Sequence, residues 1–111
     1  MREIGHLVGG KGVAGKSGRF GDVFNPDTGE VRAKVALASK AEVEAAIANA
    51  EAAQPEWAAT NPQRRARVLF KFLELIAKET DSLAAMLSSE HGKTIPDAKG
   101  DIQRGVEVVE F

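Results

Sequence analysis

Residues 10–17, which read GKGVAGKS, hold the residue types that bind nucleotide phosphates. They match the phosphate-loop pattern of two glycines, lysine and serine, and they also match the dinucleotide pattern G-x-G-x-x-G. Both motifs need a helix directly after them, because its free N–H groups bind the phosphate. Here two glycines and Pro26 follow within nine residues, so no helix is expected. We interpret the segment as a glycine-rich hairpin loop, with a nucleotide-binding loop as the alternative.

A second set of chemically capable side chains lies near the end, in residues 97–105, DAKGDIQRG. Arg104 stands between Gly100 and Gly105, and Asp101 precedes it by three residues. A planar guanidinium binds a carboxylate through two parallel hydrogen bonds, so Arg104 is a candidate ligand for an acidic substrate. The alternative is a surface arginine that pairs with Asp101 at i, i+3 on a helix. The residues by themselves favour that alternative.

The composition excludes several other kinds of site. The 111 residues contain no cysteine, which excludes disulfides, zinc–thiolate sites and a cysteine nucleophile within them, and which fits a cytoplasmic protein. The two histidines, His6 and His91, lack the spacing of a metal-binding pair. A net charge of -1, from 15 basic and 16 acidic residues, argues against a nucleic-acid partner. No apolar run approaches the ~20 residues that span a membrane, so no membrane partner is expected.

Residues 1–38 are expected to form short strands and turns. Seven of the 11 glycines fall in the first 21 residues, and Gly9-Gly10 marks the turn of a hairpin. Residues 25–30, NPDTGE, predict another turn, because proline presets φ and glycine permits a positive φ. Apolar residues alternate over 31–37, which predicts a half-buried strand.

From residue 39 the pattern becomes helical, and three to four helices are expected over 39–111. SKAE at 39–42 is a capping box, in which the serine and glutamate side chains bind each other's backbone N–H groups. The helix that follows is rich in alanine, so it could approach a neighbour closely. Trp57 would supply bulk near its end.

Two further helices follow. Asn61 and Pro62 form a helix start, and an apolar stripe then continues until Gly92 ends it. The capping residues at 80–82 predict a break or kink within this stretch. Thr94 opens the last helix, which remains apolar up to the final residue. A natural terminus is more often polar and frayed, so we expect a chain cut within a helix, with exposed apolar surface.

Arg65 lies on the apolar stripe of the second helix. A charge in such a position needs a partner, because an unpaired buried charge is costly. We expect a carboxylate such as that of Glu90 to provide that partner, and we interpret Arg65 as structural.

Four features stand in a fixed order along the chain: NPDTGE at 25–30, Trp57, Arg65, and EHGK at 90–93. Together they resemble the N-terminal part of the aldehyde dehydrogenase superfamily over nearly the whole chain. The resemblance implies an α/β parent enzyme. Residues 1–38 would form an N-terminal antiparallel β appendage, and 39–111 a mainly helical part of the NAD-binding domain, truncated at 111. It also implies a homodimer or homotetramer.

Residues 97–105, followed by VVEF at 108–111, are similar to the methylmalonate-semialdehyde dehydrogenase branch, whose members acylate coenzyme A. The resemblance implies oxidation of malonate or methylmalonate semialdehyde with NAD. A thioester on an active-site cysteine would be transferred to coenzyme A with loss of carbon dioxide, giving acetyl-CoA or propionyl-CoA. The family's nucleophilic cysteine, oxyanion asparagine and main NAD-binding segments have no counterpart here. We therefore expect these 111 residues alone to be inactive and to bind neither NAD nor coenzyme A well.

The same resemblance implies roles for individual residues. Arg104 would hold the carboxylate of the substrate and is our predicted substrate-binding residue; no catalytic and no cofactor-binding residue is predicted. Asp101 matches an acidic residue of a monovalent-cation site in some members, which the backbone carbonyls of Val23 and Phe24 would complete. We prefer to interpret Asp101 as an ordinary helix acid. The alternatives for the whole chain are a non-acylating aldehyde dehydrogenase and a stand-alone helical interaction module.

Overall fold

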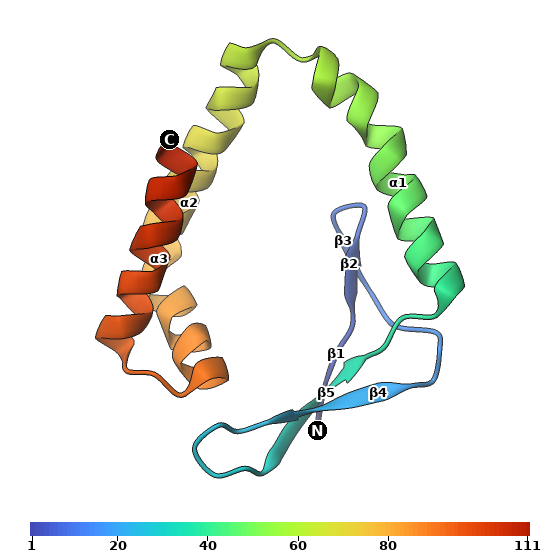
Figure 1. The fold of residues 1–111 in the computed structure, drawn as a ribbon, viewed down its shortest axis with the longest axis vertical. Helices are drawn as coiled ribbons and strands as arrows, with labels where there is room; N and C mark the ends of the chain where they lie inside the picture. Colours follow the sequence, from blue (N-terminus) through green and yellow to red (C-terminus); the bar gives the residue numbers. More distant parts are fainter. The chain divides into compact units, whose positions relative to one another are not determined.

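A computed structural model describes all 111 residues, in which five short strands precede three helices (Figure 1). The chain forms two compact units. The first consists of Met1–Asn25 and Gly29–Ala59, and the second consists of Pro26–Thr28 and Thr60–Phe111. Strands followed by three to four helices were predicted; this is confirmed, with three helices. The division at residue 38 concerns the domains of a whole enzyme and stays a prediction.

A three-stranded sheet lies in the first unit, with the strand order β1-β5-β4. Its strands are β1 (Arg2–Ile4), β4 (Phe20–Phe24) and β5 (Val31–Ala36). The central strand β5 pairs antiparallel with β4 but parallel with β1. The appendage is therefore mixed, not purely antiparallel as predicted. A parallel pair needs a long connection between its strands, and here β2, β3 and β4 all lie between β1 and β5 in the sequence.

The strand predicted over 31–37 is confirmed, but its alternation is imperfect. Ala33 is buried as expected, whereas Ala36 is also buried and Leu37 is exposed. The strand ends at Ala36, and the backbone N–H of Leu37 donates to the carbonyl of Arg19. The strand therefore ends one residue before the alternation of apolar residues in the sequence ends.

The hairpin predicted around Gly9-Gly10 is confirmed. Strands β2 (His6–Val8) and β3 (Lys11–Val13) pair antiparallel on either side of these two glycines. Gly9 and Gly10 have φ values of 61° and 75°. A two-residue hairpin loop of this kind needs positive φ at both positions, which glycine adopts without a steric penalty.

Helix α1 (Lys40–Ala59) begins at the predicted capping box. The N–H of Glu42 donates to Ser39 Oγ at 3.2 Å, and the N–H of Ser39 donates to Glu42 Oε1 at 3.0 Å. No residue of α1 is buried, and its large apolar side chains Val43, Ile47 and Trp57 are exposed. The capping box thus forms, while the large apolar side chains of the helix remain exposed.

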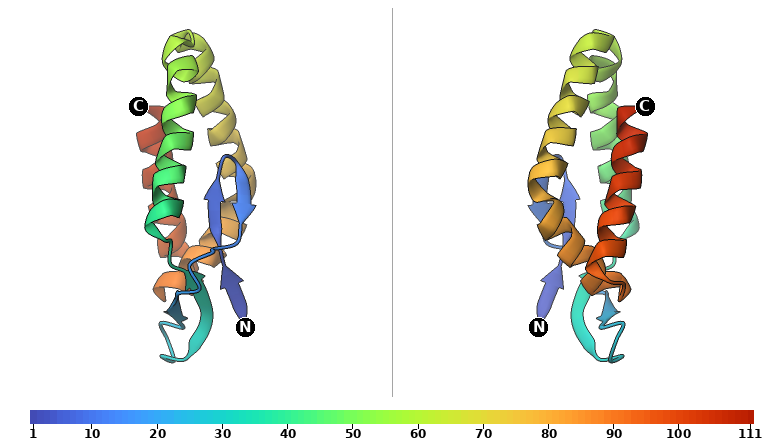
Figure 2. Two further views of the ribbon diagram at one scale, coloured as in Figure 1. Left: turned by 90° about the vertical axis from the view of Figure 1, so that its right-hand side faces the viewer. Right: turned by 90° about the vertical axis from the view of Figure 1, so that its left-hand side faces the viewer.

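In the second unit, helices α2 (Pro62–His91) and α3 (Ile95–Glu110) run antiparallel and side by side in both views of Figure 2. The predicted caps are confirmed. Asn61 Oδ1 accepts from the N–H of Gln63 at 2.8 Å, and Thr94 Oγ1 accepts from the N–H of Asp97 at 3.4 Å. Gly92 ends α2 with φ 82°, and its N–H donates to the carbonyl of Ser88.

No break occurs at residues 80–82, because α2 is one continuous helix of 30 residues, whereas the kink named as the alternative stays a prediction. The side chains that suggested a cap bind elsewhere. Thr80 Oγ1 donates to the carbonyl of Ile76 one turn earlier, at 2.8 Å, and Asp81 pairs with Lys99 of α3 at 2.9 Å. A hydroxyl that bonds to the i−4 carbonyl leaves a helix unbroken and often bends it.

Small side chains form the fully buried part of the second unit, namely Ala84 of α2 and Ala98 of α3. Large apolar side chains of α2 remain outside, and Phe70 is 64% exposed. The other exposed large apolar residues of this helix are Val68, Leu69, Phe72, Leu75 and Met86. Exposed apolar surface was predicted and is confirmed. None of the three helices combines the length and apolar character needed to cross a membrane.

Candidate functional site

The phosphate-binding motif at residues 10–17 does not form a phosphate-binding loop. Its first glycine belongs to the hairpin turn, and its centre is strand β3. The next regular element is strand β4, so no helix N-terminus follows the motif. The N–H of Lys16 donates to Glu42 Oε2 at 3.1 Å, and Ser17 Oγ donates to the carbonyl of Leu37. The prediction of a glycine-rich loop is confirmed.

Glu42 forms a small polar centre in the first unit. One carboxylate oxygen accepts from the N–H of Ser39, and the other accepts from the N–H of Lys16 and lies 3.7 Å from Nε2 of His6. These hydrogen bonds, above all that from Ser39, lower the pKa of Glu42 below its ordinary value of 4.5. The glutamate therefore joins the start of α1 to the hairpin and to the loop that follows it.

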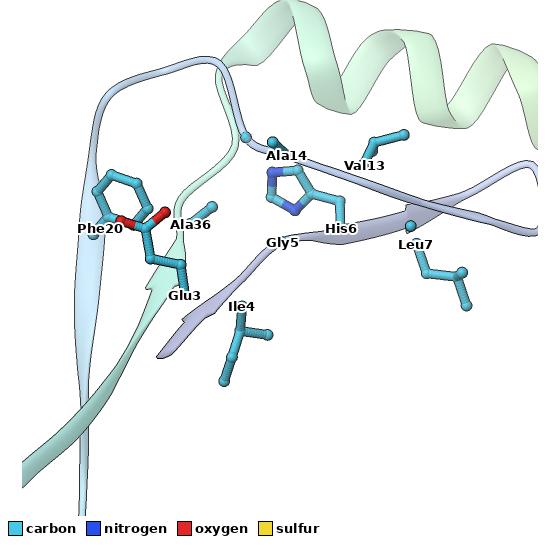
Figure 3. Close-up of a pocket in the computed structure, with 11 residues that line it drawn as sticks. Glu3, Ile4, Gly5, His6, Leu7, Val13, Ala14, Phe20 and Ala36 are labelled. Carbon is cyan, nitrogen blue, oxygen red and sulfur yellow. The ribbon is translucent and has the colours of Figure 1, made fainter. Parts of the chain in front are cut away.

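Two hollows lie on the first unit, and neither carries a catalytic arrangement. One, of about 470 Å³, has Glu3 of β1 and His6 of β2 as its ionisable lining residues (Figure 3). The other, of about 830 Å³, lies between the hairpin and α1 and is lined mainly by apolar side chains. Neither hollow contains a serine or threonine hydroxyl among its lining residues. A nucleophile with a neighbouring base, the usual requirement for covalent catalysis, is absent from both.

The second unit brings three charged side chains together at the turn between α2 and α3. Nζ of Lys93 donates to Oδ2 of Asp101, and Nη1 of Arg104 donates to Oδ1 of the same carboxylate at 2.6 Å. The side chains of Lys93, Asp101 and Arg104 are 22%, 35% and 74% exposed. The pKa of Asp101 is lowered, chiefly by the hydrogen bond from Lys93 and also by the charges of Lys93, Arg104 and His91.

Arg104 thus makes the i, i+3 pair that the residues alone favoured. The pair occupies one nitrogen of the guanidinium, and a guanidinium has five N–H donors. A Cβ added at Gly100 or Gly105 would meet no atom within 4 Å, so the space beside these glycines is open. The arginine therefore has an exposed guanidinium edge and room for a ligand next to it.

Asp101 uses both carboxylate oxygens for cations of the protein itself, Lys93 and Arg104. This agrees with the interpretation of Asp101 as a helix acid. Val23 and Phe24 lie in β4, at the irregularity in its pairing with β5. The monovalent-cation site that these three residues would form stays a prediction.

The partner predicted for Arg65 is wrong. Arg65 and Glu90 lie on the same unbroken helix, and 25 residues at ~1.5 Å per residue separate them by roughly 37 Å. Nε of Arg65 is buried and has no hydrogen-bond partner. Because α2 has no break, the two side chains cannot meet.

Sequence reasoning missed two contributors to these clusters. Lys93 reaches Asp101 across the turn at Gly92, eight residues away, and Lys16 reaches Glu42 across 26 residues. The only local signal for Lys93 was its place directly after a helix-ending glycine, from which a lysine can turn towards the next helix. The sequence around Lys16 does not predict its hydrogen bond with Glu42, because Lys16 donates through its backbone N–H and not through its side chain.

Comparison with known proteins identifies the family. Residues 13–111 match the aldehyde dehydrogenase family, which is nearly the whole chain. The chain belongs to the aldehyde dehydrogenase family. The resemblance to the aldehyde dehydrogenase superfamily that the sequence motifs indicated is thereby confirmed.

The curated relatives of this chain include semialdehyde dehydrogenases. The malonate-semialdehyde dehydrogenase of Pseudomonas aeruginosa is 44% identical over 111 residues, which is 100% of this chain and 22% of that protein. Malonate-semialdehyde dehydrogenase 3 of Geobacillus kaustophilus is 44% identical over 110 residues, which is 99% of this chain and 23% of that protein. The chain therefore spans less than a quarter of the length of these relatives.

Solved structures agree in fold with this aldehyde dehydrogenase chain. A Sinorhizobium meliloti protein described as a methylmalonate-semialdehyde dehydrogenase and complexed with NAD is 63% identical. It matches with a TM-score of 0.96, over 100% of this chain and 23% of that one. The methylmalonate-semialdehyde dehydrogenase of Oceanimonas doudoroffii is 45% identical with a TM-score of 0.94, over 99% of this chain and 22% of that one.

Proposed function

We propose that this chain is the N-terminal part of an NAD-dependent (methyl)malonate-semialdehyde dehydrogenase that acylates coenzyme A and releases carbon dioxide. The similarity to semialdehyde dehydrogenases along the full length of the chain carries this proposal. We include in it a cytoplasmic enzyme that assembles as a homodimer or homotetramer, as the family resemblance implies. The products are acetyl-CoA from malonate semialdehyde and propionyl-CoA from its methyl derivative.

The proposal assigns binding, not bond making, to these 111 residues. They contain no cysteine, so the nucleophile belongs to other residues of the enzyme. NAD accepts the hydride in such a reaction. The residues present do not fit NAD, because the glycine-rich segment at 10–17 lies in a hairpin and a loop and opens no helix. We therefore assign no NAD or coenzyme A contact to this chain.

Arg104 is the residue of this chain that we assign to the substrate. Malonate and methylmalonate semialdehyde carry a carboxylate at the end opposite the aldehyde. The exposed edge of Arg104 can bind that carboxylate through two N–H groups, and the open space at Gly100 and Gly105 leaves room for it. Holding one end of a short substrate fixes the direction of the other, which is how binding energy is used to orient a reacting group.

A chimera tests the proposal. Residues 1–111 replace the matching segment of the Sinorhizobium meliloti protein, and NADH formation from malonate semialdehyde is followed with and without coenzyme A. The proposal expects turnover that depends on coenzyme A and yields acetyl-CoA. A folded, NAD-binding chimera that releases only free acid would point to a non-acylating aldehyde dehydrogenase instead. A folded chimera that oxidises propanal but not malonate semialdehyde would contradict the proposed substrate.

A further inference from the structure

The cluster formed by Lys93, Asp101 and Arg104 shows a gradient of solvent exposure. Lys93 is its most enclosed member, Asp101 is intermediate, and Arg104 is its most exposed member. Asp101 contacts both cations, one with each carboxylate oxygen. The contacts therefore run from an enclosed lysine, through a carboxylate, to an arginine at the surface.

An exposed arginine needs such support if it is to recognise a small ligand. Its side chain has many rotamers, and ordering them on binding opposes affinity. A hydrogen bond from Nη1 to Oδ1 of Asp101 removes part of that freedom beforehand and leaves the other N–H groups of the fork for a ligand. The carboxylate is itself held by Lys93, whose side chain is 22% exposed and starts next to the helix-ending Gly92.

We propose that Asp101 is a positioning residue that orients Arg104 towards the carboxylate of the substrate, and that Lys93 fixes Asp101 in that orientation. This inference rests on the proposed function, because it needs Arg104 to contact an acidic substrate. Neither Asp101 nor Lys93 touches the substrate; both act through Arg104.

The net charge of the cluster allows two roles of Asp101 to be distinguished, namely positioning Arg104 and changing the electrostatic attraction of an acidic substrate. Lys93, Asp101 and Arg104 together carry a formal charge of +1, so the cluster still attracts an anion although it contains a carboxylate. Asp101→Asn raises that charge to +2. If attraction alone mattered, this change would lower the Michaelis constant for an acidic substrate. If Asp101 positions Arg104, the same change raises that constant, because the amide forms a weaker hydrogen bond with the guanidinium.

The experiment compares two substrates in the chimera described above. Malonate semialdehyde carries a carboxylate, and propanal does not. Arg104→Ala is expected to raise KM for malonate semialdehyde by about 10- to 100-fold, the range for losing a hydrogen bond to a charged group. Asp101→Asn is expected to raise it by about fivefold or more. For propanal, both variants keep kcat/KM within about twofold of the unsubstituted chimera.

Two further variants separate this arrangement from a structural effect. Lys93→Met is expected to raise KM for malonate semialdehyde in the same direction, and Lys93→Arg to restore it, since arginine also donates to a carboxylate. The double variant Asp101→Asn with Arg104→Ala should be no worse than Arg104→Ala alone, because Asp101 acts only through the arginine. Should Asp101→Asn fail to fold, the two Lys93 variants decide the question.

Asp81→Asn is the matched control. It breaks an Asp–Lys ion pair between α2 and α3, that of Asp81 with Lys99, without altering the cluster. It should leave KM for both substrates unchanged. An equal rise for both substrates in Asp101→Asn, a fall for malonate semialdehyde, or additive effects in the double variant would each overturn the inference.

The outcomes also separate this inference from the function on which it rests. If Arg104→Ala affects both substrates equally, the role of Arg104 in the proposed function is wrong. If Arg104→Ala is selective for malonate semialdehyde but Asp101→Asn and Lys93→Met are without effect, only the positioning role is wrong.

Discussion

Single residues hold together segments that are distant in the sequence, and Glu42 is the clearest case. Its carboxylate completes the capping box of α1 and also accepts from the backbone of Lys16 and lies near His6. The capping box could be predicted because its two members are three residues apart. The contacts with the hairpin and the loop could not, because no local pattern encodes a hydrogen bond across 26 residues.

Glu42→Gln tests the charge of this carboxylate. Glutamine keeps a side-chain oxygen for the N–H of Ser39 and removes the negative charge, so the chimera should be less stable near pH 7. The folded pKa lies below 4.5, so the stabilisation by the charge is complete above pH 4.5 and disappears as the pH falls through the folded pKa. Urea unfolding at several pH values measures this. A stability difference that grows on acidification would contradict the assignment.

Gly92 is constrained by both its backbone and its surroundings. Its φ is 82°, and an added Cβ would lie 3.3 Å from Oδ1 of Asp27 and from side-chain atoms of Pro26. Gly92→Ala should therefore destabilise by at least about 1–2 kcal/mol, the cost of a left-handed conformation for a residue with a Cβ. Thermal unfolding of the chimera measures the loss.

Gly100→Ala is the control for Gly92→Ala. Gly100 lies within α3, has no positive φ, and offers open space to a Cβ. Alanine is the better helix former there by up to about 1 kcal/mol, so this change should raise the melting temperature. Equal destabilisation by both substitutions would show that the conformation of Gly92 is not the cause.

At the scale of elements, the residues that cap helices predicted the helix ends correctly, whereas the pairing of β1 with β5 was not predicted from the sequence. Asn61, Thr94 and Gly92 marked the ends of α2 and α3 correctly, because each satisfies backbone groups next to it in sequence. The same reasoning placed a false break at residues 80–82, where Thr80 and Asp81 bind an earlier carbonyl and another helix. The parallel partner of β1 depends on the path of residues 5–30, which no local pattern reports.

One substitution at Asn61 and one at Thr80 together test whether α2 is continuous. Asn61→Ala removes a true cap and should cost about 1 kcal/mol. Thr80→Ala should be neutral or stabilising by up to about 0.7 kcal/mol, since alanine is the better residue in a helix interior. Chemical unfolding of both variants in the chimera gives the two values. A loss at Thr80 as large as that at Asn61 would restore a helix boundary there.

At the scale of the whole molecule, apolar exposure is the dominant property of these 111 residues. Large apolar side chains remain outside on both α1 and α2, including Ile47 and Phe70. Contiguous exposed apolar surface is typical of interaction sites and of proteins separated from their partners. These 111 residues therefore have the apolar exposure expected of a segment that contacts other parts of an enzyme, as the proposed function implies.

The isolated 111 residues should show this property directly. We expect them to bind the dye ANS and to associate as their concentration rises, because many large apolar side chains of α1 and α2 are exposed. Dye fluorescence and sedimentation velocity measure the two effects. A monodisperse, cooperatively unfolding monomer without dye binding would favour the interaction-module alternative.

The two fully buried alanines, Ala84 and Ala98, reverse the usual ranking of mutational tolerance. In a saturation library screened for pairing of α2 with α3, the smallest apolar side chains should be the least replaceable, with only glycine and serine accepted. Any larger residue would force the two helices apart. Phe70, at 64% exposure, should accept many residues in the same screen. The substitutions tolerated at a position in this helix pair would then depend on how closely the two backbones approach there, and not on the hydrophobicity of the side chain.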